Sequence, residues 1–294
     1  MMMKKLSDGL IIGAFFMCLS VVASYAEEAK KPITIAMFPC ADVVMSLKKF
    51  HSLVTYLKQE TGFDIEFIVK KDLAEFERAI KNKEIEFVFL DPHIYVKSAD
   101  LYDKDTLISA LTDKGSTSQS GVVIARKGEG INKLEDLKGK AVMFGPKLSA
   151  ARWVAAKVLF EESGINIDKN LKAYSNGECC EDVAFNIYLK AVDAGVVCDH
   201  FLKEHSKRQQ ALGMDAKQIV AVCRTISVPM RVFAARQEVS DDIVTKVNQA
   251  LIRLDKNKPA HAKILHRAEL GGFQSSKDKD YDGIRMLIGV KTAE

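Results

Sequence analysis

The chain has 294 residues, of which 28% are charged, and its formal net charge is +4. This length is sufficient for two domains with a large core. The charges are nearly balanced, with no basic run or arginine-rich helix, which argues against a nucleic-acid partner.

The first 26 residues have the pattern of a cleavable secretory signal. Lys4 and Lys5 precede an apolar stretch over Leu10–Ala23 that is too short for a comfortable membrane span. The small residues around Ser24 and Ala26 predict cleavage after Ala26, and an uncleaved anchor is the alternative. We therefore expect an exported protein of a bacterial periplasm.

The first part of the mature chain alternates predicted strands with predicted helices. The strands are expected at Ile33–Phe38, Asp64–Val69 and Glu86–Leu90, and the helices at Asp42–Gln59 and Leu73–Ile80. Asp91-Pro92 opens a further helix, since proline at the first helical position leaves no N–H unsatisfied. This alternation is typical of an α/β fold with a largely parallel sheet and helices on both faces.

A second α/β block follows the first. Its strands are expected at 141–144, 194–197, 219–222 and 230–235, and its helices at 150–162, 181–191, 198–208, 241–254, 260–267 and 281–288. No flexible linker separates the blocks, which favours two lobes joined by strands near 119–126 and 225–235. We expect lobe 1 to comprise 27–122 and 229–294, and lobe 2 to comprise 123–228.

The most informative segment, 134–160, predicts a strand that leads through a loop into a long helix. Open α/β sheets bind ligands at such positions, and the helix N-terminus favours anions. Ser149 is placed to cap this helix and to donate its hydroxyl to a ligand; the alternative is that it only caps. Lys147 would neutralise an oxyanion, whereas Arg152 is expected at the surface.

A second group of candidates follows the strand that ends at Leu90. Asp91, His93 and Tyr95 lie at its carboxyl end. Tyr95 would wall a pocket and donate its hydroxyl, or else pack its own helix. His93 is either a ligand-binding residue or a solvated loop histidine.

Five of the six cysteines follow the signal, an odd number that leaves at least one unpaired within the chain. Cys179 and Cys180 would begin a helix, where the pKa of a thiol is lowered. With Cys40, at the end of the first strand, they would form a soft site for a thiophilic ligand. The alternative is a structural disulfide, with Cys198 or Cys40 as candidate partners. The spacing matches no zinc pattern, so no metal is expected.

Five segments together resemble the periplasmic substrate-binding proteins of phosphate, phosphite and phosphonate ABC transporters. They include GFDIEFIVKKDLAEFERAIKNKEIEFVFLDPHIYV and GINKLEDLKGKAVMFGP and comprise residues 62–96, 130–146, 188–202, 226–254 and 271–287. The resemblance implies a type 2 periplasmic binding protein fold, with two α/β lobes that close on a ligand cleft.

The resemblance also implies particular site residues. The hydroxyl-rich loop of the family corresponds here to Lys147–Ala151, in which Ser149 keeps a hydroxyl. The family's Ser-His pair corresponds to Cys179-Cys180. Tyr95, beside His93, and the acidic Asp199 persist.

The function expected from these features is the capture of a small anion for a membrane ABC permease. The alternative is a periplasmic sensor for a thiophilic oxyanion such as arsenite, signalling to a membrane histidine kinase. We expect no enzyme and no cofactor, since the sequence has no Ser-His-Asp order, metal-hydrolase motif or P-loop.

Overall fold

The structure is a computed structural model that describes residues 31–38, 43–70, 72–201 and 213–290. All elements below belong to the unit Pro32–Glu294. The predicted signal 1–26, Cys40 and most of the predicted helix 198–208 lie outside the described residues. Within the described ranges, no helix combines the length and apolarity needed to cross a membrane.

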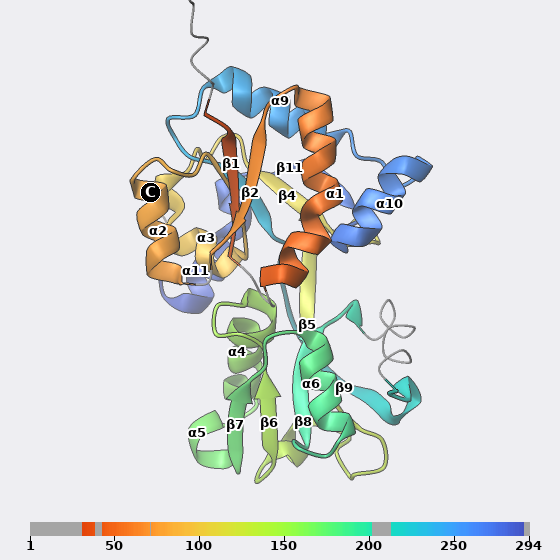
Figure 1. Cartoon of the computed structure of the whole chain (residues 1–294). Coiled ribbons are helices and arrows are strands. Elements are labelled where there is room, and N and C mark those ends of the chain that lie inside the picture. The colour runs from red at the N-terminus through yellow and green to blue at the C-terminus, as the bar shows by residue number, and fades with distance from the viewer. Residues whose placement is uncertain (1–30, 39–42, 71, 202–212, 291–294) are drawn as a thin grey trace, which may run out of the picture. The chain divides into compact units, whose positions relative to one another are not determined.

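The first sheet, whose strands β1, β2, β4 and β11 are labelled in Figure 1, has the strand order β11-β4-β10-β3-β1-β2. β1 pairs in parallel with β2 and β3, whereas β10 is antiparallel to β3 and β4, and β11 is antiparallel to β4. The expectation of a largely parallel sheet is therefore wrong, since distant segments add antiparallel strands to a parallel core. The strands are β1 (Ile33–Met37), β2 (Ile65–Val69), β3 (Phe87–Leu90), β4 (Ile108–Leu111), β10 (Val232–Ala235) and β11 (Gly272–Ser275).

Helices cover both faces of this sheet, as predicted. Side chains alternate along β3, where Phe87 and Phe89 enter one core and Val88 and Leu90 enter the other. The first core is shared with α1 (Val43–Thr61), α9 (Asp241–Ile252) and α10 (Pro259–Ala268), and the second with α2 (Leu73–Lys81), α3 (Pro92–Lys97) and α11 (Asp282–Ile288).

The second sheet has the order β7-β6-β8-β5-β9 and is also mixed. Its strands are β5 (Ser118–Arg126), β6 (Ala141–Phe144), β7 (Ala173–Asn176), β8 (Ala194–Cys198) and β9 (Ile219–Pro229). The helix α4 (Ala155–Glu162) shares one core with this sheet, next to α5 (Ile167–Asn170), and α6 (Cys180–Tyr188) shares the other.

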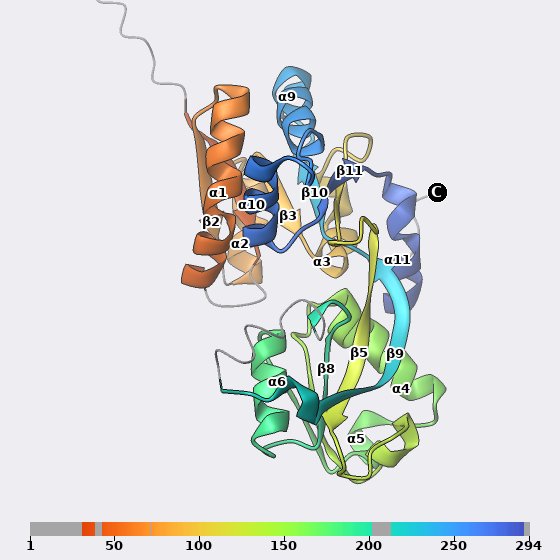
Figure 2. The same ribbon diagram turned by 90° about the vertical axis from the view of Figure 1, so that its right-hand side faces the viewer.

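The chain passes between the sheets along β5 and β9, which pair with each other from Ser118 opposite Pro229 to Arg126 opposite Ile219. Figure 2 shows these two strands side by side, running from the first sheet into the second. They were expected as crossings, although β9 is much longer than the predicted strand. The predicted helix 150–162 begins with a π-helical turn, η3 (Ala150–Val154), whose Ala150 and Ala151 pack in a core of the first sheet.

Candidate functional site

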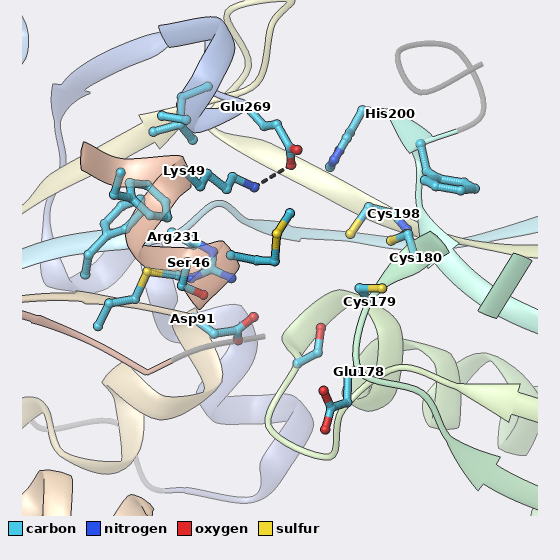
Figure 3. A pocket seen from close by; sticks show the side chains of 18 of the residues that line it. Ser46, Lys49, Asp91, Glu178, Cys179, Cys180, Cys198, His200, Arg231 and Glu269 are labelled. Carbon is cyan, nitrogen blue, oxygen red and sulfur yellow. Dashed lines mark hydrogen bonds and ion pairs between the residues drawn. The ribbon is translucent and has the colours of Figure 1, made fainter. Parts of the chain in front are cut away.

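A cavity of about 1190 Å³ lies between the two lobes, each of which contains one of the sheets (Figure 3). The part of the chain around the first sheet contributes the beginning of α1, the ends of β3 and α10, and the residues before β10. The other lining residues come from β5, which joins the two sheets, and from η3, the beginning of α6 and the end of β8. The polar and charged residues of the lining include Ser46, Lys49, Asp91, Gln119, Ser149, Arg152, Glu178, Cys179, Cys180, Cys198, His200, Arg231 and Glu269.

Asp91 joins the two helix starts that border the cavity. Its Oδ1 accepts a hydrogen bond of 2.9 Å from the backbone N–H of His93 and another of 2.9 Å from that of Ala150. One carboxylate therefore caps α3 and also binds the first residue of η3. Burial raises the pKa of Asp91 above its ordinary value, although these hydrogen bonds and the charges of Arg231 and Arg152 act in the opposite direction.

Two guanidinium groups line the cavity near Asp91. Arg152 is only 4% exposed, and its Nη2 donates to the backbone oxygen of Glu178 at 3.3 Å. Arg231 lies over the ring of Phe89, with its Cζ 5.7 Å from the ring centroid. Their charges favour an anion in the cavity, and a guanidinium group is able to donate two parallel hydrogen bonds to an oxyanion.

The expected surface position of Arg152 is wrong. Its side chain packs against Gly145, where an added Cβ would lie 2.4 Å from the Cβ of Arg152. The missing side chain at Gly145 therefore lets this arginine turn into the protein. The sequence signal for this burial was Gly145-Pro146 at the end of β6, because a glycine between a strand and a helix lets another group approach the backbone closely.

Ser149 is buried and lines the cavity, and its Oγ accepts a hydrogen bond of 3.2 Å from the backbone N–H of Arg152. The predicted capping role is thereby confirmed. The hydroxyl proton is not used in this bond, so it stays a candidate donor to a ligand. Ser46 and Gln119, which the sequence analysis did not propose as site residues, are buried polar residues of the same cavity.

We expect Ser149→Ala to lower the free energy of unfolding by about 1 kcal/mol through the lost cap. Affinity for an anionic ligand should also fall by about tenfold or more, since a hydrogen bond to a charged group contributes about 1.5–3 kcal/mol. Urea unfolding and titration calorimetry measure the two effects, and Ser149→Thr, which keeps the hydroxyl, is the control. Lower stability with unchanged affinity would limit Ser149 to capping.

The two adjacent cysteines have different surroundings. Cys179 is the N-cap of α6, where its Sγ accepts from the N–H of Asp182 at 3.3 Å, and burial raises its pKa to about 11. Cys180 begins α6, and the hydrogen bond from the Cys198 thiol, aided by the Arg152 charge, lowers its pKa to about 6 against the effect of burial. The predicted lowering is confirmed for Cys180 and wrong for Cys179.

The described ranges contain no group of three or more His, Cys, Asp or Glu side chains placed to hold a metal ion. The four cysteines within them, Cys179, Cys180, Cys198 and Cys223, are free thiols. The proposed contribution of Cys40 to a soft site lies outside the described residues.

The structure corrects the expectation for Tyr95, which is fully buried and does not line the cavity. Its hydroxyl donates to Oδ1 of Asp278 at 2.6 Å, and its ring packs between Tyr102 and Tyr281, at centroid distances of 5.9 and 4.9 Å. The short helix α3 turns this side chain into the core. The position of Tyr95 agrees with the alternative interpretation, in which its side chain serves to pack α3.

Three further candidates lie away from the cavity wall. His93 is buried, and burial together with the Lys97 charge lowers its pKa to about 4, so it is a neutral imidazole at neutral pH. Lys147 is exposed on the loop before η3. Asp199 lies 3.8 Å from Nδ1 of His200 and 3.7 Å from Nη1 of Arg224. None of the three contributes to the lining of the cavity.

Lys49 and Glu269 form an ion pair on the first-lobe side of the cavity, as the dashed line in Figure 3 shows. Neither this pair nor Arg231 was predicted from the sequence. Lys49 comes from α1 and Glu269 from the end of α10, so no local pattern connects them. Arg231 lies between Pro229 and β10, at a crossing that was predicted without reference to its charge.

Residues 35–281 match the family described as "ABC transporter, phosphonate, periplasmic substrate-binding protein". A phosphate-import protein of Mycolicibacterium smegmatis is 22% identical, over 94% of this chain and 94% of that protein.

Two solved structures show the fold. A binding protein component of an ABC phosphonate transporter from Pseudomonas aeruginosa has a TM-score of 0.74 at 16% identity, over 88% of this chain and 86% of that one. A protein from Prochlorococcus marinus, in complex with methylphosphonate, has a TM-score of 0.73 at 16% identity, over 87% and 97%. The expected two-lobe binding protein fold is confirmed.

Proposed function

The chain belongs to the family of periplasmic substrate-binding proteins of phosphonate ABC transporters, and we propose that its cavity binds a small phosphorus oxyanion. The ligand class comprises phosphate, phosphite and small phosphonates, and the bound anion is delivered to a membrane permease. Cleavage of the signal after Ala26 and the division into lobes at 122 and 228 belong to the same proposal.

The observation that carries the proposal is the pair Arg152 and Arg231 in the lining of one cavity. Two guanidinium groups favour an anion with several oxygens, because each can donate two parallel hydrogen bonds. The hydroxyls of Ser46 and Ser149 add neutral donors. Relatives named for phosphonate and phosphate transport agree with this ligand class.

The family consists of binding proteins of transporters, not of enzymes, as the sequence analysis predicted. Its description favours the transport function over the alternative of arsenite sensing through a histidine kinase. The thiols of Cys179 and Cys180 nevertheless line the cavity, so arsenite is a necessary competitor in any ligand test.

Asp91 gives the proposed site a means of selection. Its Oδ1 holds two backbone N–H groups, and Figure 3 shows the carboxylate at the cavity. A carboxylate oxygen accepts a hydrogen bond from an oxyanion that carries a proton, and it repels one that carries none. Near neutral pH phosphate keeps at least one O–H proton and a fraction of phosphite and phosphonate molecules keeps one, whereas sulfate keeps none. We therefore expect sulfate to be rejected.

A thermal-shift and calorimetric screen tests the proposed function. The reduced protein is titrated with phosphate, phosphite, methylphosphonate, sulfate and arsenite near neutral pH. We expect a phosphorus oxyanion to raise the melting temperature by mass action and sulfate to have no effect. Binding of arsenite alone, or of none of the three phosphorus oxyanions, would contradict the proposal.

A further inference from the structure

Two thiols, those of Cys180 and Cys198, lie together in the wall of the cavity (Figure 3). Cys180 is the first residue of α6, and Cys198 is the last residue of β8. The backbone N–H of Cys198 donates to Sγ of Cys180 at 3.2 Å, and the Cys198 thiol is also hydrogen-bonded to this sulfur. The two sulfur atoms are thus direct neighbours.

Rigid elements hold the two residues in this position. Gly195 of β8 lies so close to α6 that an added Cβ would be 2.4 Å from Cγ1 of Val183. Val183 and Val197 are fully buried in the core that α6 and β8 share, with Cys180 packed at its border. α6 and β8 are therefore closely packed at the place where they carry the two thiols.

The surroundings favour reaction at Cys180. The charge of Arg152 and the hydrogen bond from Cys198 stabilise its thiolate, which is the nucleophilic form of cysteine, and His200 acts in the same direction. Cys180 and Cys198 are only half-buried and line the open cavity, so a small disulfide can reach them. The sulfur of Cys179, although adjacent in sequence, accepts a hydrogen bond from the backbone N–H of Asp182 in its own helix.

We propose that Cys180 and Cys198 form a reversible dithiol–disulfide site in the wall of the ligand cavity. The oxidant is a disulfide, of a small molecule or of a thiol oxidoreductase. The Cys180 thiolate attacks one sulfur of the oxidant, which forms a mixed disulfide and releases one thiolate. Cys198 then gives up its proton, attacks Sγ of Cys180 and releases the second thiolate. The two cysteines lose two electrons, the oxidant gains them, and the single proton of Cys198 passes to one of the two released thiolates.

Oxidation changes the charge of the cavity. The reduced site presents a thiolate that is stabilised by Arg152, and the disulfide carries no charge. The oxidised protein should therefore bind an anion more tightly, since Arg152 is no longer partly neutralised. This consequence, unlike the disulfide itself, rests on the proposed function.

Peptide mapping without any ligand tests the site. The purified protein is reduced with dithiothreitol, desalted, equilibrated with oxidised glutathione, alkylated and digested. We expect a peptide that links Cys180 to Cys198, alkylation of Cys179 and Cys223, and loss of the link after renewed reduction. A link from Cys179 to Cys198, a lasting glutathione adduct on Cys180, or full alkylation of Cys179, Cys180, Cys198 and Cys223 would each overturn the proposal.

Variants identify the two steps. Cys198→Ser should accumulate a mixed disulfide with glutathione at Cys180, because the resolving thiol is absent. Cys179→Ser and Cys223→Ser should retain the link and serve as matched controls. Methylphosphonate affinity of oxidised and reduced protein is then compared. Equal affinities would refute the charge effect alone, and a missing link would refute the disulfide whether or not methylphosphonate binds.

Discussion

Replacing Arg231 with methionine should weaken the binding of methylphosphonate by about 10- to 150-fold, since a hydrogen bond to a charged group contributes about 1.5–3 kcal/mol. Arg231 lines the cavity and is half-buried, with its guanidinium over Phe89. Methionine keeps much of the apolar stem and its contact with the ring, while it removes the charge and the donors. Titration calorimetry measures the loss of affinity, and thermal unfolding verifies that the fold is kept.

Two variants make this result specific. Arg253→Met removes an exposed guanidinium that lies outside the cavity and 3.6 Å from Glu60, and it should leave the affinity unchanged. Arg231→Lys keeps the charge but loses the planar fork, so its affinity should lie between those of wild type and Arg231→Met. If Arg231→Met binds methylphosphonate as tightly as wild type, the anion does not contact Arg231.

Most helices and strands could be predicted because their signals are local. α1, α2 and β6 follow from apolar periodicity, and Asp91-Pro92 correctly marks the beginning of α3. The mixed character of the sheets could not be predicted in this way. β10 inserts between β3 and β4 although more than 100 residues separate it from both, and no local pattern encodes such a pairing.

The same limit explains the site. Ser149, Asp91 and the two adjacent cysteines were found, because each marks the beginning of a helix in the sequence. Tyr95 was expected to face the ligand because of its place after a strand. The direction of its side chain instead depends on packing against Tyr281 and α11, which lie near the other end of the sequence. Arg152 was misjudged for a similar reason, because its burial depends on Gly145.

Cys179 and Cys180 show why a helix start alone does not determine the pKa of a thiol. Both residues stand at the N-terminus of α6, yet burial raises the pKa of one thiol and the hydrogen bond from Cys198 lowers that of the other. The deciding contact comes from β8, 18 residues further along the chain. A contact with a neighbouring element thus outweighs the shared helix position.

The substitution Asp91→Asn should allow the cavity to bind sulfate. The amide oxygen of asparagine still accepts from the N–H groups of His93 and Ala150, so both helix starts keep their partner. The amide nitrogen replaces a repelling acceptor with a donor that an unprotonated oxyanion needs. We expect the affinity for sulfate to rise by at least about tenfold, from a gain of about 1.5–3 kcal/mol. Asp91→Ala, which loses both backbone bonds, should instead destabilise the protein by about 2 kcal/mol.

The pH dependence of sulfate binding identifies the group responsible. Burial raises the pKa of Asp91, so this carboxyl takes up a proton at a higher pH than an exposed aspartate does. Once protonated it donates a hydrogen bond, so sulfate affinity should increase as the pH falls in the protein with Asp91, and this increase should be missing in Asp91→Asn. Sulfate is the suitable probe because it does not itself titrate near neutral pH.

Other cavity groups also titrate and need a control. Protonation of the Cys180 thiolate, with its pKa of about 6, likewise favours an anion at lower pH, and His200 lines the same cavity. The pH dependence of sulfate affinity is therefore measured for Cys180→Ser and for the double variant Cys180→Ser, Asp91→Asn. Any contribution of His200 is common to these two proteins. Their difference isolates Asp91. Coincident profiles, or an Asp91→Asn protein that still rejects sulfate, would show that the Asp91 carboxylate does not face the bound anion.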